Sequence, residues 1–307
     1  RRPPRQRSSA GGSGIAFRHL PGMHACMHAC VLCIHVHELN VFLIHLISGI
    51  EPAISYVLGS YIGSIIGWRM CFLLISIAAA IMLIYCLPAL PETLMEKKKF
   101  RFKDLILNYY TLAKSKKFLL YLTIKVLSVA IFFVEITNLS LIFIEQYGLS
   151  VNMFGFNMIL FILAYTIGGF ISNKLVDYYE YDQVIKFGII LVLGSNIVLL
   201  PLIYFYDIPA HIIQLVKTPF AFGLALIFGN TTCCIVDIFP KIAGSASAKM
   251  ITMEMIASSF FTYFVSLFYN GTFYPIICFI IVTATIAYMA LRSILTLKRR
   301  EALQQNS

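Results

Sequence analysis

Charged residues are scarce in this chain. Only 12% of its 307 residues are Asp, Glu, Lys or Arg, whereas 59% are hydrophobic. A water-soluble domain of this length cannot hide so much apolar surface, because part of every globule faces water. The composition therefore excludes an ordinary soluble protein and predicts a chain that lies in a lipid bilayer.

The sequence also lacks the short motifs of the common enzyme classes. It contains no GxSxG, no Walker phosphate-binding loop and no HExxH. Two acids in apolar stretches, Glu135 and Glu254, offer an acid pair, but no fixed nucleophile or metal site accompanies them. We therefore predict that the protein is not an enzyme and needs no cofactor.

Long apolar stretches dominate what is present. A helix that spans a bilayer needs about 20 apolar residues, and eight stretches reach that length. They are too long for the strands of a membrane barrel and do not alternate between polar and apolar residues. We predict an all-α integral membrane protein. The predicted spans are residues 41–64, 70–90, 118–144, 151–173, 185–206, 212–236, 244–268 and 273–295.

The net charge of +10 comes from loops, so it indicates membrane topology rather than nucleic-acid binding. The loop 91–117 is the most basic, whereas loops on the opposite side, such as 145–150, contain no Lys or Arg. Lys/Arg-rich loops stay in the cytoplasm, which places 91–117 and the tail 298–307 inside. Residues 102–113 are predicted to form a short surface helix.

The first 38 residues differ from the rest. Residues 1–14 are basic and polar, and residues 23–37 are rich in His and Cys, with a CxxC pair at Cys30 and Cys33. Such a density favours a soft metal ion, but the spacing matches no closed zinc module. We interpret 1–38 as an atypical leader and predict no metal site.

Small residues suggest how the spans pack. Gly59 and Gly63 lie four residues apart and therefore on one helix face, and Gly168 and Gly169 form a second small surface. In lipid, small residues let helix backbones approach closely. We predict that these two surfaces pack against each other, and that a tight turn at Trp68 and Arg69 follows the first span.

Polar groups inside apolar stretches are the functional candidates, because an ionised group in hydrocarbon is costly. In the span 118–144, Lys125, Ser128, Glu135 and Asn138 share one side of the helix. Lys125 is expected to extend to the inner surface and Lys217 to the outer one. Glu135 lies too deep for that and is predicted to face a cavity.

Several stretches resemble one family in order and spacing. Residues 49–69 resemble the antiporter signature and following turn of drug/proton antiporters of the major facilitator superfamily. The other matching stretches are similar to the Bcr/CflA-type multidrug exporters. These are residues 90–94, 108–121, 146–155, 173–176, 229–232, 239–248 and 271–272.

The resemblance implies a major facilitator fold with two six-helix halves, of which the eight spans here correspond to the last eight. Residues 39–90 then hold two helices of an incomplete N-terminal bundle, and residues 118–297 form the six-helix C-terminal bundle. We expect a closed pathway to need a further chain that supplies the other four spans. Glu51 and Glu254 stand where such exporters more often carry Ala and Gln.

The implied function is proton-coupled multidrug efflux of amphipathic, drug-like and often cationic molecules across a bacterial inner membrane. The alternatives are a non-transporting remnant, a membrane binding subunit, or a membrane metalloenzyme that uses the His/Cys leader. The candidates for a substrate or proton pathway are Glu51, Glu135, Asn138, Asn157, Asn230 and Glu254.

Overall fold

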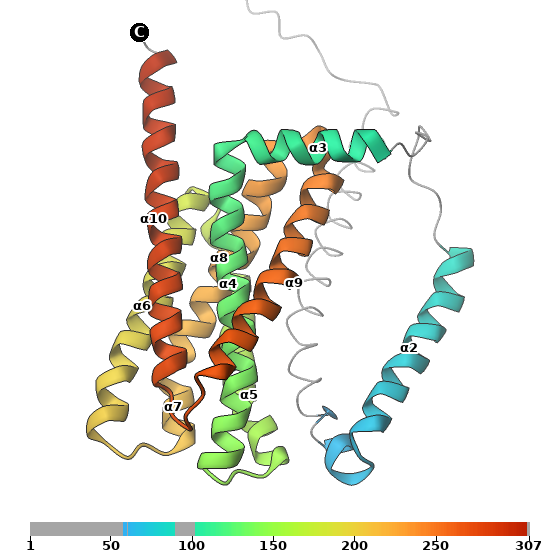
Figure 1. Cartoon of the computed structure of the whole chain (residues 1–307), viewed down its shortest axis with the longest axis vertical. Coiled ribbons are helices and arrows are strands. Elements are labelled where there is room, and N and C mark those ends of the chain that lie inside the picture. The colour runs from blue at the N-terminus through green and yellow to red at the C-terminus, as the bar shows by residue number, and fades with distance from the viewer. Residues whose placement is uncertain (1–57, 60, 90–101, 306–307) are drawn as a thin grey trace, which may run out of the picture. The chain divides into compact units, whose positions relative to one another are not determined.

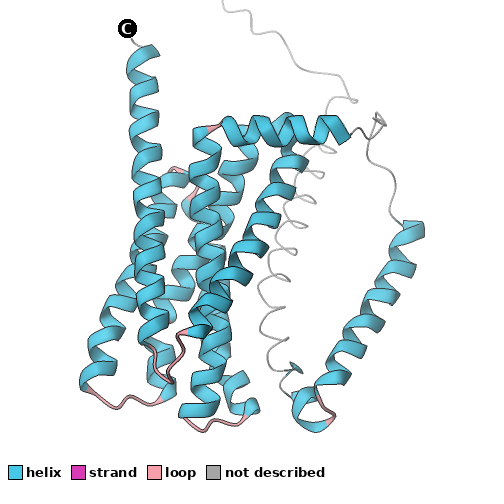
Figure 2. Cartoon of the chain, in the orientation of Figure 1, coloured by secondary structure: helices cyan, strands magenta, loops and turns pink. Residues whose placement is uncertain are grey.

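The computed structural model describes residues 58–59, 61–89 and 102–305, which belong to one compact unit, His45–Ser307. Every regular element in these residues is helical (Figure 2). Seven of the helices are long and apolar enough to cross a membrane, which confirms the all-α membrane class. The predicted leader, Glu51 and most of the first predicted span lie outside the described residues.

The described helices agree with the predicted spans to within a few residues, with two exceptions. The last helix continues to Gln305, ten residues beyond the predicted end at residue 295, and the span 212–236 is discussed below. A π-helical turn, Ile142–Gln146, extends α4, and a 3-10 turn, Pro240–Ile242, precedes α9. The bounds are α2 Trp68–Ala89, α3 Phe102–Lys114, α4 Lys116–Leu141, α5 Val151–Leu175, α6 Tyr181–Phe205, α7 Ala210–Val216, α8 Thr218–Ile238, α9 Ala243–Leu267 and α10 Tyr274–Gln305 (Figure 1).

Local sequence explains where several helices begin. The Ser115 hydroxyl accepts a hydrogen bond from the backbone N–H of Phe118 at 3.3 Å and so caps α4. The turn before α2 is made by Gly67, whose φ of +98° suits a residue without Cβ. Trp68 already belongs to α2, so the predicted turn lies one residue earlier than expected.

The predicted span 212–236 is wrong in its first part. The structure divides this region into the short α7 and the longer α8, with Lys217 between them. Pro219 lies in the first turn of α8, where its missing N–H costs no helical hydrogen bond. The proline therefore starts a new helix instead of continuing the old one.

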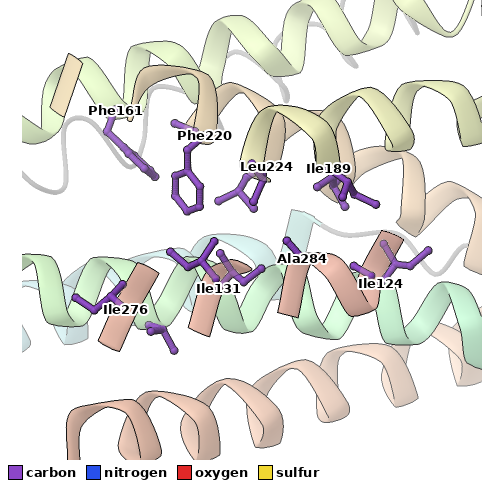
Figure 3. Packing of buried hydrophobic residues seen from close by; sticks show 14 of the residues in the cluster. Ile124, Ile131, Phe161, Ile189, Phe220, Leu224, Ile276 and Ala284 are labelled. Atoms are coloured by element: carbon purple, nitrogen blue, oxygen red, sulfur yellow. The ribbon is translucent and has the colours of Figure 1, made fainter. Parts of the chain in front are cut away.

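The interior of the bundle is built around α4, which packs on α8, α9 and α10. Figure 3 shows two facing layers of buried side chains. Ile124 and Ile131 of α4 lie with Ile276 and Ala284 of α10 on one side, and side chains of α5, α6 and α8 lie opposite. Side chains from distant parts of the sequence thus share one apolar core.

The closest backbone approaches join α8 to α5 and α6. A Cβ on Gly188 of α6 would lie 2.7 Å from the carbonyl oxygen of Gly223, and a Cβ on Gly223 would lie 2.6 Å from that of Gly188. A Cβ on Gly168 of α5 would lie 2.9 Å from the carbonyl oxygen of Phe222. Gly168 thus lies against α8.

The predicted pairing of Gly168 and Gly169 with Gly59 and Gly63 stays a prediction, because most of the first predicted span lies outside the described residues, but the partner of Gly168 within them is α8. No other heavy atom of the described residues lies within 4 Å of a Cβ built on Gly59 or Gly169. The prediction was based on glycines four apart in the sequence. The close approach at Gly188 and Gly223 needs only one glycine on each helix, which such a pattern does not reveal.

The ends of the spans differ in charge. Helix alternation brings the end of α5, with Lys174, and the end of α10, with Lys298, to the same end of the bundle as α3. At the other end, residues 145–150 and 206–209 contain no Lys or Arg. The positive-inside rule predicts that the end carrying α3 faces the cytoplasm.

Gly188→Ala is expected to lower the thermal unfolding midpoint of the purified chain, because the new methyl group meets a backbone oxygen that cannot move aside. Overpacking of this kind costs about 1–3 kcal/mol. Gly194→Ala on the same helix is the control, since its added Cβ would have no heavy atom of another described helix within 4 Å. Equal midpoints for the two variants would contradict the close helix contact.

Cysteine labelling in intact cells tests the orientation. Lys116→Cys should resist a membrane-impermeant thiol reagent, whereas Asp207→Cys should react, because the two exposed positions lie at opposite ends of the bundle. Mass spectrometry of the labelled peptides distinguishes the introduced cysteines from the native ones. The reverse pattern would overturn the predicted topology.

Candidate functional site

The polar side of α4 faces the protein interior. Lys125 is 7% exposed, Ser128 is 1% exposed, and Glu135 and Asn138 are fully buried. Their spacing of three, seven and three residues keeps them on neighbouring turns of one helix side. The shared side expected from the sequence is thus enclosed by the helices that pack on α4.

Glu135 forms a buried ion pair with Lys217, and both side chains are fully buried. The expectation that Lys217 extends to the outer surface is wrong. Lys217 lies at the break between α7 and α8, where its ammonium group also lies 5.6 Å from the ring centre of Phe220 and 5.8 Å from that of Phe273. The unexpected break places the lysine in the interior.

Lys125 also differs from the expectation, because its ammonium group stays inside. It donates a hydrogen bond to the backbone carbonyl of Phe228 on α8 at 3.0 Å and lies 4.7 Å from the Phe228 ring centre. The Thr232 hydroxyl donates to the same carbonyl at 2.9 Å. The Lys125 ammonium group therefore binds the Phe228 carbonyl inside the protein instead of water at the membrane surface.

Glu254 of α9 is 7% exposed, and its Oε1 atom has no hydrogen-bond partner among the described residues. Its carboxylate interacts electrostatically with the Lys125 ammonium group. Helix α9 packs along α4, so the two opposite charges belong to facing helices. The structure thus brings together one predicted acid and one lysine that the sequence had assigned to the surface.

Glu254 begins a polar stripe on α9. Ser258 and Thr262 follow at intervals of four residues, and each has a buried hydroxyl oxygen without a partner in the described part of the chain. One turn further, the Ser266 hydroxyl lies 3.5 Å from Asn138 Oδ1 of α4. We call these four side chains, with Lys125 and Asn138 opposite, the α4–α9 polar seam.

The predicted amides have different environments. The Asn230 side chain donates to Ser172 Oγ at 2.8 Å and to the Leu226 carbonyl at 2.6 Å, which ties α8 to α5. The Asn138 side chain donates to the Val134 carbonyl of its own helix at 2.8 Å. Asn157 is half-buried on α5. Of the three amides, Asn138 alone belongs to the polar seam.

Sequence reasoning missed Ser258 and Thr262, although their spacing from Glu254 was visible. It also missed a network at the end of the bundle that carries α3. There the Tyr121 hydroxyl donates to Asp182 Oδ1 at 2.5 Å, and Lys298 forms an ion pair with Asp182 Oδ2 at 2.5 Å. This network joins α4, α6 and α10. Among the described residues, no cluster of His, Cys, Asp and Glu suits a metal ion.

Glu135→Gln should destabilise the chain by about 3–5 kcal/mol, because it leaves the Lys217 charge buried without its partner. Replacing both residues, as Glu135→Leu with Lys217→Met, should recover most of the lost thermal stability. Lys117→Gln is the control, since its pair with Glu301 is exposed and such pairs contribute at most about 1 kcal/mol. A double variant no more stable than the single one would contradict the pair.

Comparison with known proteins agrees with this architecture. No curated protein matches the chain. Residues 43–262, more than two thirds of the sequence, match the sequence profile of the Major Facilitator Superfamily. Members of this family are multi-pass membrane transporters rather than enzymes. With its seven apolar helices in the described region, the chain belongs to the major facilitator superfamily.

Proposed function

We propose that this transporter exports amphipathic, cationic small molecules from a bacterial cell in exchange for protons. Its family membership supports transport as such. The finer assignment is supported by the resemblance to Bcr/CflA-type exporters over the motifs quoted above. It is also supported by ionisable side chains inside membrane spans, which commonly mark ion and substrate pathways.

The observation that carries the proposal is the unpartnered carboxylate oxygen of Glu254. A buried polar atom without a hydrogen bond is costly, and the cost is higher in hydrocarbon, where water cannot satisfy it. The same oxygen is free to bind a proton or to accept a hydrogen bond from a cationic substrate. Proton and substrate then compete for one group, as exchange requires.

Lys125 has a supporting role in this scheme. Its charge compensates the ionised Glu254 when neither ligand is bound, and the Phe228 carbonyl holds the ammonium group in place. Ser258, Thr262 and Asn138 extend the polar seam along the membrane normal. They offer hydroxyl and amide groups to water or to polar parts of the substrate.

The other candidates receive different assignments. The charge of Glu135 is neutralised by Lys217 in a fully buried ion pair. We therefore assign this pair to holding α4 against the α7–α8 break. Asn230 likewise joins α8 to α5. We therefore assign the exchange role to Glu254 without Glu135 and keep Asn157 as a pathway candidate.

Binding of tetraphenylphosphonium to the purified chain in nanodiscs tests the competition. The dissociation constant should rise up to about tenfold for each unit that the pH falls through the titration of Glu254, because the proton displaces the cation. Glu254→Gln should weaken binding and remove the pH dependence. Isothermal titration at several pH values measures both effects.

Glu180→Gln serves as the control, since Glu180 is exposed at the start of α6 and makes no capping hydrogen bond with its side chain. This variant should keep the affinity and the pH dependence of the unmodified chain. An unchanged pH dependence in Glu254→Gln would refute Glu254 as the shared site. In vesicles that also contain a chain supplying the other four spans, binding without proton-driven uptake would refute transport by exchange.

A further inference from the structure

Helix α3 is fixed to the bundle by one of its faces. Leu112 is fully buried, and Tyr109 packs against the core. The Asn108 side chain donates to Ser245 Oγ at 3.2 Å, and Lys249 donates to the Tyr109 carbonyl at 3.2 Å. These contacts hold α3 on the first turns of α9.

The opposite face of α3 exposes apolar side chains. Ile106 is 55% exposed, Leu107 is 59% exposed and Tyr110 is 57% exposed. Positions 106, 107 and 110 are adjacent on a helix surface, so they form a continuous strip, which we call the α3 apolar strip. No other helix of the described region covers it.

Basic residues border this strip. The Lys114 ammonium group lies 4.5 Å from the ring centre of Tyr110, and the exposed Lys116 is the first residue of α4, separated from α3 by Ser115 alone. In the sequence, Lys97, Lys98, Lys99 and Arg101 come immediately before α3. An exposed apolar strip with lysines at its border is typical of helices that lie in the plane of a membrane surface.

The orientation of α3 fits that position. Figure 1 shows α3 lying across the end of the bundle, transverse to α4, whose direction we take as the membrane normal. A helix in this orientation lies parallel to the bilayer surface at the level where α4 and α9 begin. Its aromatic and cationic side chains are those that occupy the headgroup region.

We propose that α3 is a docking surface for anionic lipid headgroups on the inner side of the membrane. The α3 apolar strip inserts between lipids, and Lys114 and Lys116 bind headgroup phosphates. Asn108 and Lys249 join α3 to α9, the helix that also carries Glu254. Lipid bound to α3 is therefore linked to α9 through these contacts. The inference is independent of the transported substrate, since no residue of the polar seam is part of this surface.

A tryptophan reporter on α3 tests the docking. In the full chain, Trp68→Phe removes the single native tryptophan, and Tyr110→Trp introduces an aromatic ring that can still contact Lys114. The protein is placed in nanodiscs that contain a lipid brominated near its headgroup. Replacing part of the phosphatidylcholine by phosphatidylglycerol should increase quenching of the reporter at least about twofold, because each nearby lysine favours an anionic surface by about fivefold.

Substitution of the lysines separates electrostatic docking from general lipid proximity. Lys114→Gln with Lys116→Gln should return the quenching to the value in phosphatidylcholine alone. The matched control, Lys174→Gln with Lys186→Gln, removes two exposed lysines at the same end of the bundle and should leave the quenching unchanged. Unchanged thermal unfolding midpoints verify that the variants are folded.

Three outcomes would overturn the proposal. Strong quenching by acrylamide in water, with no effect of the brominated lipid, would place the α3 apolar strip in the cytoplasm. Protection of the reporter from both quenchers would show that another part of the protein covers the strip. Equal quenching with and without phosphatidylglycerol would likewise exclude recognition of anionic headgroups.

Discussion

Hydrocarbon offers no hydrogen bonds, so every polar group inside the membrane spans depends on the protein for a partner. This constraint explains the arrangement of most polar side chains. Glu135 and Lys217 neutralise each other, Lys125 binds a backbone carbonyl, and Asn230 binds Ser172. Among the described residues, the buried side-chain atoms that lack a partner include those of the polar seam and also Glu135 Oε2, Asn196 Oδ1 and both amide atoms of Gln214. On α9 such atoms gather along one face, and this concentration distinguishes the polar seam from scattered defects.

Close helix packing provides the partners. Hydrophobicity does not drive helices together in lipid, because the lipid tails are as apolar as the side chains. The contact between Gly188 and Gly223 brings α6 and α8 close together, and Gly168 brings α5 against the other side of α8. Because these contacts fix the position of α8, the Phe228 carbonyl on α8 can bind Lys125. Lys217, at the start of α8, can pair with Glu135 for the same reason. The glycine contacts and the charged contacts are therefore two parts of one arrangement.

The sequence predicted the helices well, because hydropathy and length are sufficient for spans in a membrane. It also predicted the polar side of α4 and the surface helix α3, since both follow from helical periodicity. It failed at the two lysines and did not reveal the glycine contacts of α8. Snorkelling is a property of one side chain, whereas burial of Lys125 depends on a carbonyl of α8 that is 103 residues away in the sequence. Such pairings arise only when the helices are placed in space.

The break at Lys217 shows how local chemistry can redirect a distant interaction. Pro219 was visible in the sequence, but the apolar stretch 212–236 was long enough to mask its effect on the helix. Once α7 ends at Val216, the chain turns and Lys217 enters the interior beside Glu135. An acid that the sequence predicted to face a cavity is therefore one half of a buried ion pair, and the exchange site that we propose is Glu254 rather than Glu135.

The packing of α9 agrees with this assignment. Among the candidate spans from α4 to α10 in the described region, α9 has the smallest buried share, whereas α4 is fixed near one end by Tyr121 with Asp182 and further along by Glu135 with Lys217. Segments with few buried contacts open and move at lower cost in free energy than the core. The acid with the unpartnered oxygen thus lies on the span with the least burial, facing a span held at two levels. A group that exchanges ligands between two sides of a membrane needs one helix that stays in place, here α4, and a neighbouring helix that can move, here α9.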